Sequence, residues 1–90
     1  MGWFVYMLRC NDDTLYTGIT TDVKRRVEEH NGTPVGKGAK YTKARRPVEL
    51  VYKKGCKDRS GAAKGEAALR KLSKIEKLKL IPVKGFKSGF

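Results

Sequence analysis

Apolar and β-branched residues dominate the start of the chain, where residues 3–10 read WFVYMLRC. A run with so few polar positions is typical of a strand that is buried on both faces and is therefore central in its sheet. The polar cluster at 11–14 predicts a turn, and residues 15–19 predict a second strand that returns beside the first. Gly18 lies inside this second strand, where a glycine indicates a bulge or a close approach to the backbone.

The pattern becomes helical after the second strand. Thr20 or Thr21 can cap a helix that runs to about Asn31, and Gly32 provides its stop. Apolar residues then alternate with other residues over 48–54, which predicts a third strand.

Two further helices are predicted in the C-terminal part of the chain. The first covers residues 59–72, and the pair Ser73 and Glu76 forms a capping-box pattern that starts a short helix through Leu80. We therefore expect one α+β domain over residues 1–82, with a three-stranded sheet flanked by helices in the order ββαβαα. Residues 83–90 are expected to form a loose tail.

The composition is strongly basic. Lys and Arg number 21 against nine acidic residues, which gives a net charge of +12. Such a charge predicts attraction to nucleic acid or to anionic lipid, although a generally basic soluble protein explains the composition equally well. No predicted helix pairs a basic face with large aromatic residues, which disfavours a lipid surface as the partner.

The two cysteines, Cys10 and Cys56, and the single histidine leave no ligand set for zinc. Isolated cysteines fit reduced thiols in a cytoplasm better than a disulfide framework. The apolar N-terminal run is shorter than the roughly 20 residues that span a membrane, and it lacks the features of a signal peptide. We therefore expect a cytoplasmic protein that does not bind membranes.

Arg26 and His30 lie one turn apart on the apolar side of the first predicted helix, which they share with Val23. This side turns towards the sheet, where a guanidinium is costly unless an anion meets it. Taken singly, Arg26 could extend past the edge of the core and His30 could be a hydrogen-bonded core histidine. Together, and facing strands that carry Tyr6 and Tyr16, they favour a functional site.

Glu66 lies on the small, apolar side of the second predicted helix, beside Ala62, Ala63 and Leu69. A carboxylate framed by alanines has room for a metal ion and its waters, and Mg²⁺ commonly takes one or two protein carboxylates. A salt bridge to a neighbouring Lys or Arg is the more ordinary explanation, and the helical pattern alone favours it.

The order of these residues resembles the GIY-YIG nuclease superfamily. Residues 4–6 (FVY) and 16–18 (YTG) stand where that family has its two motifs, Arg26 and His30 follow on one helix, and Glu66 follows on a later one. The stretches LYTGIT, RRVEEHN and GEAALRKLSKIEK resemble its short bacterial members, many of them uncharacterised. The resemblance covers residues 3–81 and implies an antiparallel three-stranded sheet flanked by helices.

The activity implied by this resemblance is hydrolysis of a DNA phosphodiester, with one Mg²⁺ or Mn²⁺ on Glu66 as the Lewis acid. The alternative is a nucleic-acid-binding module that kept the fold and lost turnover. Intact Glu66 and Arg26 favour the enzyme, because a pure binder has no use for a carboxylate in a basic cleft. No obligate protein partner is expected.

The resemblance also implies a role for each site residue. Tyr6 and Tyr16 are the motif tyrosines, Gly18 is the motif glycine, and Arg26 would bind the scissile phosphate. One of the two tyrosines, with Tyr6 favoured over Tyr16, would take a proton from the attacking water, for which nearby cations must lower its pKa. His30 and Tyr16 would position water or share the proton.

A basic loop is predicted over residues 32–47. Its cations, with no acidic residue among them, are Lys37, Lys40, Lys43, Arg45 and Arg46. Together with Tyr41, this loop is expected to hold a DNA backbone without reading its sequence.

Overall fold

The structure is a computed structural model, and it describes residues 2–33 and 38–81. Lys37 and the expected tail at 83–90 lie outside the described residues. Helix α1 spans Val23–His30, α2 spans Lys40–Lys43, α3 spans Arg59–Arg70 and α4 spans Lys74–Leu80. None of these described helices is long and apolar enough to cross a membrane.

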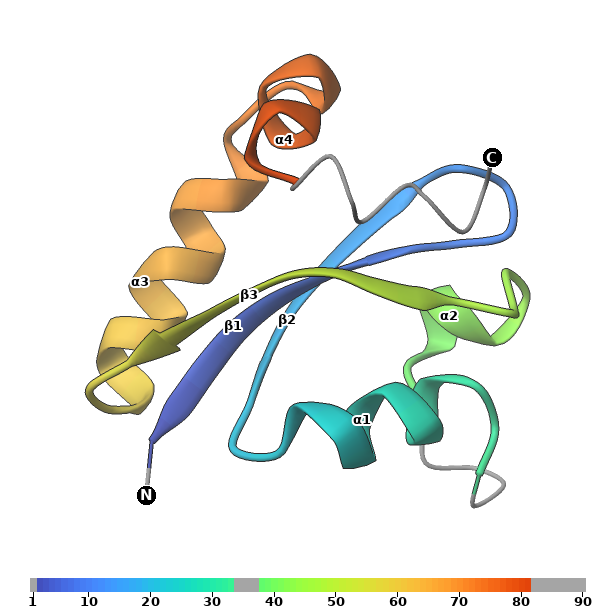
Figure 1. The fold of residues 1–90 in the computed structure, drawn as a ribbon, viewed down its shortest axis with the longest axis horizontal. Helices are drawn as coiled ribbons and strands as arrows, with labels where there is room; N and C mark the ends of the chain where they lie inside the picture. Colours follow the sequence, from blue (N-terminus) through green and yellow to red (C-terminus); the bar gives the residue numbers. More distant parts are fainter. Residues whose placement is uncertain (1, 34–37, 82–90) are drawn as a thin grey trace.

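Three strands form an antiparallel sheet in the order β2-β1-β3 (Figure 1). Strand β1 spans Trp3–Arg9, β2 spans Leu15–Thr20 and β3 spans Glu49–Cys56. Strand β1 is central and its middle residues are buried, as the apolar run predicts. Strand β3 runs past its predicted end because Cys56 pairs with Trp3 at the start of β1. The predicted α+β class is confirmed.

Helices α1 and α3 lie on opposite sides of the sheet (Figure 1). Since side chains alternate across a strand, β1 contributes to two apolar clusters. Val5 and Met7 pack with Leu69 of α3, whereas Tyr6 and Leu8 pack on the other face together with Val27 of α1. Strand β2 is an edge strand, and helix α3 packs against both β1 and β2.

Local signals at the helix ends were partly predictive. The capping box at Ser73 and Glu76 is present at the start of α4. The cap of α1 is Asp22, not Thr20 or Thr21 as predicted, because the Asp22 carboxylate accepts a hydrogen bond from the Arg25 backbone N–H at 3.1 Å. The single turn α2, inside the predicted loop, was not foreseen.

Candidate active site

Tyr6 lies over Gly18, its partner on the neighbouring edge strand. A Cβ atom at Gly18 would lie 2.6 Å from the Tyr6 hydroxyl and 2.8 Å from the ring carbon that bears it. The β1–β2 register is continuous at this pair, so Gly18 forms no bulge there. The close approach expected at this glycine is therefore that of the Tyr6 phenol, which is 1% exposed.

Gly18→Ala is expected to destabilise the protein by about 1–3 kcal/mol, because the added methyl group must displace the buried phenol. Urea unfolding measures this change. Gly55→Ala is the matched control, since Gly55 also lies in a strand opposite an aromatic residue of β1, but its Cβ would lie 3.8 Å from Phe4. We expect the control to stay within about 0.5 kcal/mol of wild type. Equal effects of the two substitutions would contradict the packing described.

His30, at the end of α1, is fully buried and hydrogen-bonded at both ring nitrogens. Its Nε2 lies 2.7 Å from the Tyr6 hydroxyl, and its Nδ1 lies 2.8 Å from the hydroxyl oxygen of Thr42. The edge of the ring meets Tyr16 with a centroid separation of 5.0 Å. Burial, aided by the nearby positive charge of Arg26, lowers the pKa of His30 to about 4. The imidazole is therefore neutral near pH 7, and neither nitrogen is open to a metal ion.

The pKa of His30 predicts a pH-dependent stability. The folded value of about 4 lies below the roughly 6.5 of an unfolded histidine, so the unfolded chain binds more protons between these values. This contribution is fully present above about pH 6.5 and is lost as the pH falls towards 4. We expect urea unfolding to show a loss of about 2 kcal/mol from this group between pH 7 and pH 5. His30→Gln should show a correspondingly smaller loss, and an identical pH dependence in both proteins would contradict this account.

Arg26 lies beside both a carboxylate and the buried phenol. Its Nη1 donates to the Glu29 carboxylate at 2.8 Å, and its positive charge is close enough to Tyr6 to lower the pKa of the phenol. Burial lowers the pKa of Arg26, but Glu29 and Tyr6 raise it by more, so the net shift is upwards. The Arg26 side chain is about one quarter exposed and lines a surface hollow of about 330 Å³ together with Arg25 and with Thr20 of the edge strand. A permanent cation that is partly open to solvent therefore lies near the buried phenol.

The pKa of Tyr6 corrects one expectation. Nearby cations were expected to lower it, but burial and the neighbouring Tyr16 raise it to about 12. Arg26 does lower the pKa, though by less than burial raises it. Tyr6 therefore holds its proton at neutral pH and does not act as a preformed phenolate.

Glu66 lies on α3, on the opposite side of the sheet from α1, which carries Arg26 and His30 (Figure 1). Helix α3 packs against β1 and β2, and the negative charge of Glu66 is close enough to Tyr6 to raise the pKa of the phenol. The Glu66 side chain is 22% exposed and pairs with Arg70 Nη2 at 2.7 Å, so the salt bridge considered from the sequence is present. Its helix neighbours Ala62 and Leu69 are buried.

The donors available to a metal ion are few. Residues 2–33 and 38–81 contain no group of three or more His, Cys, Asp or Glu side chains that could hold one. Glu66 is the carboxylate best suited to bind a metal ion. Its side chain is partly exposed, and its partner Arg70 is mostly exposed and able to move away. One carboxylate, completed by water and phosphate oxygens, suits Mg²⁺ or Mn²⁺. The residues present therefore fit a weakly held hard cation and not a preformed metal cage.

The basic loop does more than present charge. Arg45 Nε donates to Asp12 at 3.0 Å, and its guanidinium lies 4.0 Å from the centre of the Tyr41 ring. Tyr41 in turn stacks on Tyr16 with a centroid separation of 5.7 Å. Arg46 Nε donates to the His30 backbone carbonyl at 2.8 Å. These two arginines thus hold the loop against the site.

The remaining described cations of the loop, Lys40 and Lys43, are exposed on α2 and are available to a polyanion. Sequence reasoning missed Thr42, which lies between them and contacts His30. A threonine in a predicted loop carries no signal of its own, and its partner lies 12 positions earlier in the chain.

Known proteins match nearly the whole length of this chain. A sequence profile described as the GIY-YIG catalytic domain matches residues 2–79. A UPF0213 protein of Desulfotalea psychrophila is 53% identical over 88 residues, which is 98% of this chain and 76% of that protein. A UPF0213 protein of Syntrophus aciditrophicus is 52% identical over 79 residues, covering 87% of each chain.

Solved structures give the same result. The solution NMR structure of the UPF0213 protein BH0048 from Bacillus halodurans is 41% identical to this chain, with a TM-score of 0.57. The match covers 94% of this chain and 87% of that one. The structure of EF2693 from E. faecalis is also 41% identical, with the same TM-score.

Proposed function

The chain belongs to the GIY-YIG family, and from this premise we propose that it is a metal-dependent endonuclease that hydrolyses DNA phosphodiester bonds. The observation that carries the proposal is the buried hydrogen bond between the Tyr6 hydroxyl and the neutral imidazole of His30, beside the Arg26 guanidinium. This arrangement joins a proton acceptor to a cation suited to a phosphate. In a purely structural core, such groups would only add desolvation costs.

Tyr6 would act as a proton relay and not as an anion. Its hydroxyl oxygen takes a proton from the attacking water while its own proton moves to His30 Nε2. The oxygen of that water bonds to phosphorus, and the phosphorus–oxygen bond to the leaving 3′-oxygen breaks. The low pKa of His30 opposes this transfer. A phosphate bound at Arg26 would offset the smaller part of this effect, because its negative charge cancels the repulsion between Arg26 and the imidazolium but leaves the cost of burial.

Arg26 and Glu66 would bind the other charges of the reaction. The planar guanidinium of Arg26 can donate to two phosphate oxygens at once and stabilise the charge that develops on them. Glu66 would hold a Mg²⁺ or Mn²⁺ ion, which supplies Lewis-acid stabilisation of the same phosphate when bound. Tyr16, half-buried against His30, would help to position the water.

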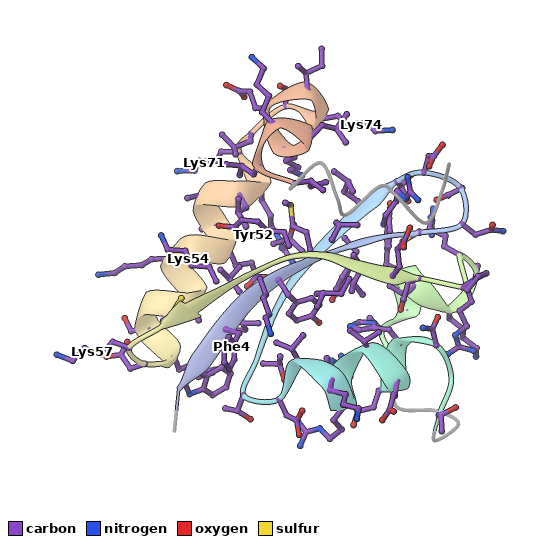
Figure 2. All side chains as sticks on the ribbon, in the orientation of Figure 1. Phe4, Tyr52, Lys54, Lys57, Lys71 and Lys74 are labelled. Carbon is purple, nitrogen blue, oxygen red and sulfur yellow. The ribbon has the colours of Figure 1, made fainter. Side chains whose placement is uncertain are left out.

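Attraction to DNA would come from many exposed cations in addition to Lys40 and Lys43. Figure 2 shows lysine side chains projecting away from the fold near the end of β3 and around α3 and the start of α4, including Lys54, Lys57 and Lys71. Contacts of this kind with phosphate neutralise charge without reading sequence, so binding should weaken steeply as salt rises.

A supercoiled-plasmid nicking assay with Glu66→Gln tests the function. The wild type is expected to nick the plasmid in Mg²⁺ or Mn²⁺, and Glu66→Gln is expected to lose roughly 10²-fold or more of that rate. Glu28→Gln removes the same charge from an exposed position on α1 and should cleave like the wild type. Equal rates for Glu66→Gln and the wild type would show that Glu66 has no role in cleavage. A wild type that binds DNA but cleaves none would support the binding-module alternative.

A further inference from the structure

Thr42 lies fully buried in the single turn α2, against the imidazole of His30. We propose that Thr42 is a positioning residue for the nuclease reaction, because it holds the proton of His30 on Nδ1 and so leaves Nε2 to accept the proton of Tyr6. The catalytic part of this inference rests on the function proposed above, whereas the placement of the proton can be tested without it.

The hydrogen bonds run in series from Tyr6 through His30 and Thr42 to a backbone carbonyl, and this carbonyl sets the direction of each bond. The Thr42 hydroxyl donates to the backbone carbonyl of Ala39 at 3.0 Å, and a carbonyl oxygen can only accept. The hydroxyl has one proton, and with that proton on the Ala39 carbonyl its oxygen accepts from His30 Nδ1–H, 2.8 Å away. A neutral imidazole has one N–H group, which leaves Nε2 as the acceptor for the Tyr6 hydroxyl at 2.7 Å.

The loop is built to keep Thr42 in this place. A Cβ atom at Gly38 would lie 2.6 Å from the Glu29 carbonyl oxygen and 3.1 Å from the His30 Cα, so the backbone passes directly against the last turn of α1. Arg46 donates to the His30 carbonyl from the same segment, and Arg45 Nη1 donates to the Tyr41 carbonyl at 2.9 Å. The Thr42 hydroxyl is thus fixed relative to both the helix and the imidazole.

Removing the Thr42 hydroxyl would change whether the His30 nitrogen beside Tyr6 is a hydrogen-bond acceptor or a donor. Without the Thr42 oxygen, an Nδ1–H group would have no acceptor. The Nε2–H tautomer of His30 then competes with the Nδ1–H tautomer, because it leaves an unprotonated Nδ1, and no N–H group, facing the space vacated by the hydroxyl. In that form Nε2 donates to the Tyr6 oxygen and cannot take its proton. The relay from Tyr6 to His30 would then lose its acceptor even though every catalytic side chain is still present.

Nitrogen-15 NMR of His30 reads the tautomer directly, because His30 is the one histidine of the sequence. In the wild type at pH 7 we expect Nδ1 protonated and Nε2 unprotonated. Thr42→Ser keeps the hydroxyl and should give the same spectrum, whereas Thr42→Val removes it at nearly constant size and should shift the population towards Nε2–H. A wild-type spectrum dominated by Nε2–H would overturn the proposal whether or not either variant folds.

Cleavage assays on the same proteins test the catalytic part. Thr42→Val is expected to lose roughly 10²-fold in cleavage rate, whereas Thr42→Ser should cleave within a few-fold of the wild-type rate. A Thr42→Val protein that folds and cleaves at the wild-type rate would overturn the positioning role. If the wild type does not cleave at all, the proposed function fails, while the NMR result still decides whether Thr42 fixes the tautomer.

Discussion

Replacing Arg26 with lysine is expected to reduce DNA cleavage by roughly 10²-fold or more while leaving folding and DNA binding close to wild type. Lysine keeps the positive charge, but it cannot present the planar fork that meets two phosphate oxygens together. Lysine can still pair with Glu29 at the edge of the core and extend its ammonium to solvent, so the free energy of unfolding should change little.

Arg25→Lys is the matched control for this prediction. Arg25 is the adjacent residue on α1, is exposed, and also approaches the Glu29 carboxylate, at 3.5 Å. The same chemical change is thus made on the same helix and beside the same acid. Arg25 lines the same surface hollow as Arg26, but it is not among the charges that shift the pKa of Tyr6 or His30. We expect Arg25→Lys to cleave like the wild type. If Arg26→Lys also retained full cleavage, Arg26 would be a residue of the core edge with no role in the reaction.

Tyr6→Phe is expected to lose roughly 10²- to 10⁴-fold in cleavage rate, because it removes the hydroxyl through which a proton reaches His30. It should also lower the free energy of unfolding by about 1–3 kcal/mol, since Nε2 of the buried imidazole is left without a donor. Single-turnover cleavage and urea unfolding measure the two effects separately.

Tyr52→Phe controls for the loss of a phenol from the sheet. Tyr52 lies in β3 and packs on the α3 side, away from His30. We expect near wild-type cleavage and stability from this variant. If Tyr6→Phe lost stability but cleaved normally, the hydrogen bond to His30 would be structural only and the relay would be wrong.

The sequence carried enough information to predict the elements that depend on local patterns. The unbroken apolar run in β1 implied a central strand, and the pair Ser73 and Glu76 implied the start of α4, since both signals act between residues close in the chain. The helical period likewise placed Arg26 and His30 on one face of α1. That face does meet Tyr6.

The parts that were missed depend on contacts between distant segments. The position of Thr42 against His30 results from a loop that returns to the end of α1, and no periodicity in residues 38–46 predicts this return. The role implied for Tyr6 required nearby cations to lower its pKa, yet packing over Gly18 and against His30 buries the phenol and raises the pKa. Charge could be counted from the sequence, whereas desolvation required the fold.

The proposed function requires this site to hydrolyse phosphodiester bonds and not merely to bind DNA. The most direct test is to incubate supercoiled plasmid with the wild type in Mg²⁺ or Mn²⁺ and then treat the nicked circles with DNA ligase. We predict nicks that the ligase reseals, because hydrolysis that releases the 3′-oxygen leaves a 3′-hydroxyl and a 5′-phosphate. Intact plasmid with both metal ions, at protein concentrations that saturate DNA binding, would contradict the account.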